Sequence, residues 1–402
     1  MAVRAVPDLG GSIRLRYSEE QDRARYRWRP LSRCECTIWE STVKGGITIR
    51  LEDLGYSAFF EAKRQALGLD GYAVARVIAE YRGAYRIKDP ARECLAAITG
   101  KQMFDSMSRE DYPAVGDWVA ATELDAEQAV IHRVLPRKTI LQRKYSDRSE
   151  SQVIASNVDA VFIIESVDRD YNLNRFERYL AIVTDGNIRP IIILNKIDLI
   201  SEAESDLKAS QTRKRFKGVD VIRTSAIQEK GIEELAAHIS RGETYCLLGS
   251  SGVGKSSLIN KLLGDEIIRT STISSHTGKG MHTTTGREMY FLENGGILID
   301  NPGMREIGMA DAGAGIENVF AEIAALAKKC RFVDCTHIHE PGCAVKEAIR
   351  SGRLDEGKLS HYLKLKKETE IYEMTKLDKR TKDRELGKYI KGAKKQRKKR
   401  GL

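Results

Sequence analysis

A glycine-rich segment at 249–256 has the residue types and the spacing of a phosphate-binding loop. It reads Gly-Ser-Ser-Gly-Val-Gly-Lys-Ser, follows the apolar run 245–248 and precedes a helical pattern. In that setting backbone N–H groups cradle phosphate oxygens, Lys255 reaches the β and γ phosphates, and the Ser256 hydroxyl ligates Mg²⁺. The residues predicted to bind here are Gly249, Ser250, Ser251, Gly252, Val253, Gly254, Lys255, Ser256 and Ser257. A flexible Gly/Ser turn is the alternative, which the flanking strand and helix disfavour.

The segment Asn195-Lys196-Ile197-Asp198 predicts which base is bound. It ends an apolar run at 191–194, which is typical of a buried parallel strand, and nucleotides bind at the carboxyl edge of such strands. The Asp198 carboxylate can accept hydrogen bonds from guanine N1–H and the 2-amino group, which adenine does not offer there. Ser225 and Ala226 follow another short strand and can present a backbone N–H to guanine O6, although this dipeptide alone is a weak signal. We therefore expect GTP and GDP as ligands, and Asp198 argues against a P-loop ATPase or kinase.

Asp300 ends a predicted strand at 296–299, where its carboxylate can hold a water on Mg²⁺. The Gly303 amide is then expected to meet the γ-phosphate. Residue 304 is a methionine, whereas many GTPases carry a glutamine here that orients the attacking water. We therefore expect slow intrinsic hydrolysis.

The polar segment 277–285 is rich in Gly and Thr and predicts a switch loop. Thr285, or alternatively Thr284, is expected to sense Mg²⁺ and the γ-phosphate. His282 is either a catalytic residue that positions water or an ordinary solvated histidine.

These motifs occur in an unusual order, because the base-recognition segments at 195–198 and 225–226 precede the phosphate loop and Asp300. A cyclic shift of strand and loop units keeps every loop at the same edge of a parallel sheet, since neighbouring strands need not be consecutive in the chain. We therefore expect a circularly permuted α/β P-loop GTPase fold.

Three cysteines and one histidine near the C-terminus have the spacing of a metal site. Cys330, Cys335, His337 and Cys343 can supply three thiolates and one imidazole to a closed tetrahedral zinc ion, which would be structural. His339 is an alternative ligand, and free loop thiols are the alternative to a metal. Apolar residues at helical spacing flank the loop on both sides.

Together these features resemble the circularly permuted, ribosome small-subunit-dependent GTPases (RsgA-like). The resemblance runs from about residue 51 to the C-terminus and includes the motif order and the segments 278–285 and 302–306. Met281 and Asn301 depart from it, because arginine and threonine are usual there. The family implies an OB-fold, a GTPase domain and a helical zinc-binding domain, favours His337 as the zinc ligand, and implies late assembly of the small ribosomal subunit with hydrolysis stimulated by that subunit.

The domain boundaries predicted from these patterns divide the chain into six parts. They are an unassigned segment at 1–46, a helical lead-in at 47–70, an OB-fold-like barrel at 71–145, the permuted GTPase domain at 146–312, a zinc-binding helical domain at 313–375 and a basic tail at 376–402. The first segment matches nothing, so a disordered extension and an upstream mis-start both fit it. In the barrel, Tyr81, Arg82, Tyr85, Arg86 and Lys88 either stack on RNA bases or form an ordinary strand surface.

The net charge of +10 lies in the tail, where 376–402 holds 13 Lys/Arg and 3 Asp/Glu. Such an arm is typical of a solvated segment that binds polyphosphate, most simply rRNA. No secretory signal and no long apolar run are visible, so we expect a cytoplasmic protein that does not bind membranes. We also expect a monomer. The competing hypothesis is a GTP-gated RNA-binding switch whose partner is not the ribosome.

Overall fold

The computed structural model describes residues 5–7, 13–15, 41–42, 48–81, 83–100, 102, 108–144, 151–168, 171–264, 287–300 and 313–373. The chain divides into two units, 1–39 and 40–402. In the first, β1 (Ala5–Pro7) pairs antiparallel with β2 (Ile13–Leu15). The second holds all the predicted sites, and it begins with a short pair of strands, β3 (Ser41–Thr42) and β4 (Thr48–Ile49).

A closed five-stranded barrel follows, which confirms the predicted β-barrel. Its strands are β5 (Ala73–Tyr81), β6 (Ala84–Lys88), β7 (Glu93–Ile98), β8 (Trp118–Glu123) and β9 (Gln128–Val134). They pair in the order β5-β6-β7-β9-β8, and β8 pairs back with β5 to close the barrel. Helix α1 (Ala58–Ala66) covers it from outside, where Phe60 packs on Trp118. Two short 3₁₀ turns, η1 (Glu52–Leu54) and η2 (Arg109–Asp111), precede α1 and β8.

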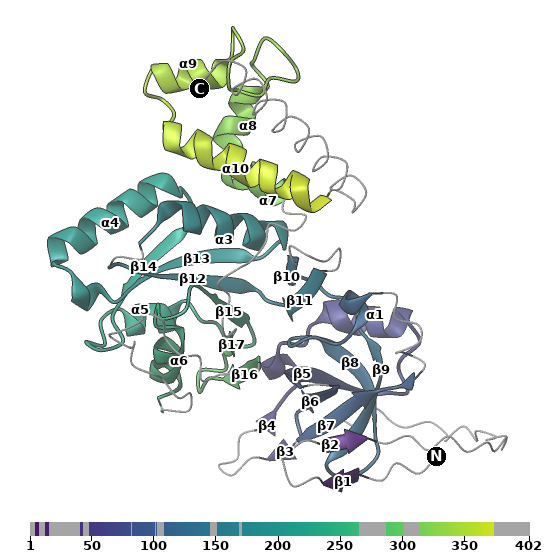
Figure 1. Cartoon of the computed structure of the whole chain (residues 1–402). Helices are drawn as coiled ribbons and strands as arrows, with labels where there is room; N and C mark the ends of the chain where they lie inside the picture. The colour runs from purple at the N-terminus through teal and green to yellow at the C-terminus, as the bar shows by residue number, and fades with distance from the viewer. Residues whose placement is uncertain are drawn as a thin grey trace, which may run out of the picture. The chain divides into compact units, whose positions relative to one another are not determined.

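The nucleotide-binding part is a six-stranded sheet between two layers of helices. Its strands, in spatial order, are β14 (Asp220–Thr224), β13 (Arg189–Asn195), β12 (Ala160–Ser166), β15 (Thr244–Leu248), β17 (Ile297–Asp300) and β16 (Glu288–Phe291). All are parallel except β16. Figure 1 shows α3 (Leu173–Asp185) and α4 (Glu202–Arg215) over one face and α5 (Ile232–Ala237) and α6 (Lys255–Leu263) over the other. The nearly continuous apolar strands fit a sheet buried on both faces.

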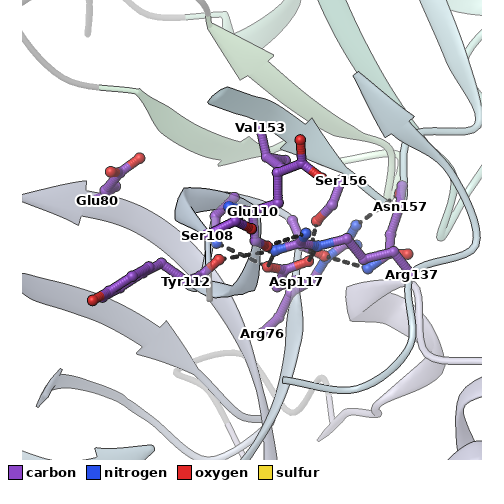
Figure 2. Close-up of polar contacts among 12 residues, drawn as sticks. Arg76, Glu80, Ser108, Glu110, Tyr112, Asp117, Arg137, Val153, Ser156 and Asn157 are labelled. Carbon is purple, nitrogen blue, oxygen red and sulfur yellow. Dashed lines mark hydrogen bonds and ion pairs between the residues drawn. The ribbon is translucent and has the colours of Figure 1, made fainter. Parts of the chain in front are cut away.

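The barrel and this sheet are joined by backbone pairing and by a buried polar network. Strand β16 pairs with β5, and the hairpin β10 (Ile140–Lys144) and β11 (Ser151–Ser156) links the two parts along the chain. The buried Arg76 guanidinium donates to the Asn157 carbonyl at 3.2 Å and to the Thr244 hydroxyl at 2.8 Å. The Ser156 hydroxyl donates to Asp117 at 2.5 Å (Figure 2). Burial lowers the pKa of Arg76 to about 10, but the side chain stays charged at neutral pH.

In the described residues after the sheet, four helices pack on its α3 side. They are α7 (Gly313–Val319), α8 (Ala321–Ala327), α9 (Ala344–Arg350) and α10 (Glu356–Glu373). Phe320 and Val345 share one hydrophobic cluster with Phe176 of α3. A Cβ placed on Gly315 would lie 1.9 Å from the Ala181 carbonyl oxygen, so α7 approaches α3 backbone to backbone. Among the described residues no helix combines the length and apolarity needed to cross a membrane.

Candidate functional site

The base-recognition segment and the phosphate loop meet at the carboxyl edge of the sheet. The Asn195 amide donates to the Val253 carbonyl at 2.8 Å and accepts from the Thr224 hydroxyl at 3.0 Å. The Lys196 ammonium donates to the Gly252 carbonyl at 2.5 Å. The two contacts with Gly252 and Val253 join segments that are more than fifty residues apart in the chain. A cyclic shift is predicted to change the order of the strand and loop units along the chain but to keep their loops at one edge of the sheet. The contacts between the two segments confirm this prediction.

The loop at 249–254 connects β15 to α6 and has little room for side chains. A Cβ on Gly249 would lie 2.2 Å from the Ile164 carbonyl oxygen, and one on Gly254 would lie 2.4 Å from the Asn195 amide nitrogen. Glycine at both positions lets strand β12 and the base segment approach the loop directly. The buried Lys255 ammonium donates to the carbonyls of Gly249 at 2.8 Å and Ser250 at 2.9 Å. The cation therefore lies inside the loop, where phosphate oxygens are expected.

The Asp198 carboxylate is held by the side chain of Ser225, which the sequence did not reveal. The Ser225 hydroxyl donates to Asp198 at 2.5 Å and accepts from the Gln228 N–H at 3.1 Å. The sequence predicts only a backbone N–H from Ser225 or Ala226 at this point. The sequence motifs do not predict this contact, because it joins the side chains of two separate loops. This hydrogen bond restricts the orientation of the Asp198 carboxylate.

Asp300 ends β17 beside the strand that leads into the phosphate loop, and it is 1% exposed. This is the position predicted for a carboxylate that holds a Mg²⁺ water. Ser256 and Ser257 lie in the first turn of α6. His282, Thr285 and Gly303, together with the alternatives and departures noted at residues 281, 284, 301 and 304, lie outside the described residues.

The four predicted zinc ligands form one cluster. Their ligand atoms all lie within 4.8 Å of one another. The Cys330 and Cys343 sulfurs are 3.8 Å apart, and they lie 3.6 and 3.4 Å from His337 Nδ1. A tetrahedral zinc ion with Zn–S bonds of about 2.3 Å places two sulfurs about 3.8 Å apart, so the cluster has the dimensions of such a site. Burial lowers the pKa of His337, which favours the neutral imidazole that can ligate a metal. His339 is exposed and is not in the cluster.

On the barrel, the aromatic and basic residues of β5 and β6 do not form one surface. Tyr85 is 6% exposed and belongs to the barrel core, so the hypothesis that it stacks on RNA is wrong. Tyr81 is 39% exposed, and the Arg86 guanidinium lies over its ring at 5.6 Å from the centroid. The alternating directions of side chains on a strand explain the division.

Comparisons with known proteins agree with the geometry. The model of the RsgA GTPase family matches residues 134–310. Small ribosomal subunit biogenesis GTPase RsgA 2 of Lactiplantibacillus plantarum is 41% identical over 301 residues, which are 74% of this chain and 84% of that protein. Small ribosomal subunit biogenesis GTPase RsgA 1 of Listeria innocua is 42% identical over 312 residues, covering 78% of this chain and 86% of that protein.

Solved structures show the same fold. YjeQ from Thermotoga maritima has a TM-score of 0.54 and 26% identity, and the match covers 74% of this chain and 98% of that one. YloQ, described as a circularly permuted GTPase, has a TM-score of 0.52 and 21% identity over 76% of this chain and 97% of that one. With the two nucleotide segments joined at one sheet edge and relatives above 40% identity over most of their length, the chain belongs to the RsgA GTPase family.

Proposed function

We propose that this chain hydrolyses GTP and acts as a late assembly factor of the small ribosomal subunit, which stimulates the hydrolysis. The observation that carries the proposal is the joined site, in which Asn195 ties the base segment to the phosphate loop and Ser225 fixes Asp198. The printed names of the relatives, small ribosomal subunit biogenesis GTPases, favour the ribosome over another RNA partner.

The residues divide the work of binding and hydrolysis. Asp198 selects guanine, and the loop amides and Lys255 hold the phosphates. Ser256 would bind Mg²⁺ directly, and Asp300 would bind it through a water molecule. Mg²⁺ would neutralise charge that develops on the phosphate oxygens. Thr285 and Gly303 complete the γ-phosphate contacts in this proposal, and His282 positions the attacking water. Met304 cannot orient that water, so a group supplied or reordered by the subunit must complete the site.

A structural zinc ion is proposed at Cys330, Cys335, His337 and Cys343. The distances between the sulfur and nitrogen atoms of this cluster fit a tetrahedral ion. The four side chains would fill all four coordination positions, so none would be open to a substrate, as in a structural site. The Lys346 N–H also donates to the Cys343 sulfur at 3.5 Å. The ion would hold the loop that connects α8 to α9.

The partners are proposed to be GTP and GDP, the small subunit and its rRNA, with the basic tail at 376–402 as an rRNA-binding arm. We propose a cytoplasmic monomer. The experiment that tests the function is the affinity for purified small subunits, measured by sedimentation with a non-hydrolysable GTP analogue and with GDP. Tighter binding with the analogue is expected. Equal affinity for small subunits with the GTP analogue and with GDP, or equal affinity for large and small subunits, would contradict the proposed function.

A further inference from the structure

Strand β16 lies between the nucleotide sheet and the barrel, and it pairs with both (Figure 1). Its first residue, Glu288, is the cross-strand partner of Asp300 in β17 and of Ala79 in β5. On the other side of β17, the register with β15 ends at Cys246 and Ile299, one residue before Asp300. Within the described strands, Glu288 is therefore the cross-strand partner on which the position of Asp300 depends.

This pairing bears on the residue that is proposed to bind Mg²⁺ through water. Asp300 is 1% exposed, so its carboxylate is closely surrounded by protein. The two residues of a cross-strand pair have Cα atoms about 4.5–5.5 Å apart and side chains on the same face of the sheet. A shift of β16 along or away from β17 would therefore change where the Asp300 carboxylate can lie.

The residue before Glu288 fastens β16 to the barrel through its side chain. Arg287 lies opposite Glu80 of β5, and its guanidinium meets the Glu80 carboxylate at 3.3 Å. The same guanidinium donates to the Val153 carbonyl of β11 at 3.4 Å. The Arg287 side chain is 18% exposed and that of Glu80 is 33% exposed, so solvent screens the pair only in part. Burial raises the pKa of Glu80, and the positive charge of Arg287 opposes this shift.

We propose that Glu80 and Arg287 are positioning residues for magnesium binding, because they hold Glu288, the strand partner of Asp300, against the barrel. The barrel then contributes to the affinity of the nucleotide site for Mg²⁺. This inference rests on the proposed function through the magnesium role of Asp300. None of the nucleotide-binding motifs includes Glu80, which lies 207 positions from Arg287 in the chain.

The first test measures how the affinity for a fluorescent, non-hydrolysable GTP analogue depends on the Mg²⁺ concentration. Glu80→Gln keeps the shape of the side chain and removes its charge. We expect the midpoint of the Mg²⁺ dependence to rise by about three- to ten-fold, less than the roughly 10–100-fold typical of a residue bonded directly to a metal ligand. Affinity for the analogue in EDTA should stay at the wild-type value, because the phosphate loop is unchanged.

Glu123→Gln is the matched control. Glu123 forms its ion pair with Arg92, which lies between β6 and β7, and neither residue has a described contact with β16. Equal Mg²⁺ midpoints for Glu80→Gln and this control overturn the proposal. A loss of affinity in Glu80→Gln that is as large in EDTA as with Mg²⁺ also overturns it, because such a loss reflects general destabilisation of the site.

Arg287→Met tests whether the two residues act as a pair. The substitution removes the cation and keeps the apolar part of the side chain. We expect it to raise the Mg²⁺ midpoint at least as far as Glu80→Gln does, because the contact with Val153 is lost as well. The double variant with Glu80→Gln should have the midpoint of Arg287→Met alone. A further rise to the product of the two single effects overturns the pairing.

Asp300→Asn distinguishes failure of this inference from failure of the proposed function. Its Mg²⁺ midpoint is expected to rise at least as far as that of Glu80→Gln. An unchanged midpoint for Asp300→Asn overturns the magnesium role of Asp300 and this inference with it. A raised midpoint for Asp300→Asn together with a wild-type midpoint for Glu80→Gln overturns the link to the barrel alone.

Discussion

At the scale of single residues, we expect base selection to depend on the carboxylate of Asp198. Asp198 is held by the Ser225 hydroxyl at 2.5 Å, so it can meet two adjacent donors of guanine at little further entropic cost. Asp198→Asn replaces an acceptor with a donor, and xanthine carries a carbonyl where guanine has its amino group. The variant is expected to lose GTP affinity by at least about a hundred-fold and to prefer xanthosine triphosphate. Competition against a fluorescent GDP analogue measures both.

The control for this exchange is ATP, which should compete poorly with both proteins. Wild-type protein that binds ATP as tightly as GTP would contradict the role of Asp198. Retention of GTP preference by Asp198→Asn would do the same.

Some of these residue roles can be predicted from the sequence and others cannot. Asn195, Asp198 and the loop at 249–256 are predictable because their chemistry is local and each follows a short apolar strand. Ser225 is not predictable in this role, since its partner Asp198 lies in another loop and any polar side chain fits the local pattern.

At the scale of elements, the close contact between α7 and α3 is expected to be sensitive to mutation. Gly315 has no space for a methyl group, because a Cβ would meet the Ala181 carbonyl oxygen at 1.9 Å. Gly315→Ala gains helix propensity but forces the helices apart, and a net destabilisation of about 1–3 kcal/mol is expected. Urea unfolding measures it. Gly71→Ala, which meets nothing within 4 Å, is the control and should change stability by less than about 0.5 kcal/mol. Equal effects would show that α7 can move away freely.

The metal cluster gives a second prediction at this scale. Wild-type protein should hold one zinc ion per chain, and Cys335→Ser and His337→Ala should lose it because a closed site needs all four ligands. His339→Ala should keep its zinc, since that side chain is exposed and outside the cluster. Elemental analysis after dialysis against a chelator checks this. If His339→Ala loses zinc and His337→Ala keeps it, His339 is the ligand instead of His337.

The elements themselves were largely predictable, but their packing was not. Apolar strands ending in polar motif residues predicted the parallel sheet, and the cyclic order followed from where those motifs occur. The apolar helical residues near Cys330 predicted helices but not their partner. Helix α3 became that partner through Gly315 and the pairs at Glu177 and Arg178, which no local pattern specifies.

At the scale of the whole molecule, the positive charge and the nucleotide site occupy different parts of the chain. Deleting residues 388–402 removes eight Lys/Arg and no acidic residue. Binding to small subunits should weaken and depend less steeply on salt, because fewer counterions are released, while GTP hydrolysis without subunits stays within two-fold of wild type. Affinities at several salt concentrations test this. An unchanged slope would mean that the tail does not contact phosphate.

We expect the small ribosomal subunit to complete the catalytic site of this GTPase. The most direct measurement is the steady-state rate of GTP hydrolysis with purified small subunits, with large subunits and with bulk RNA at equal nucleotide concentration. We expect slow turnover of the protein alone, because Met304 cannot orient water, and an increase of at least about ten-fold with small subunits only. Equal stimulation by all three, or none by the small subunit, would contradict it.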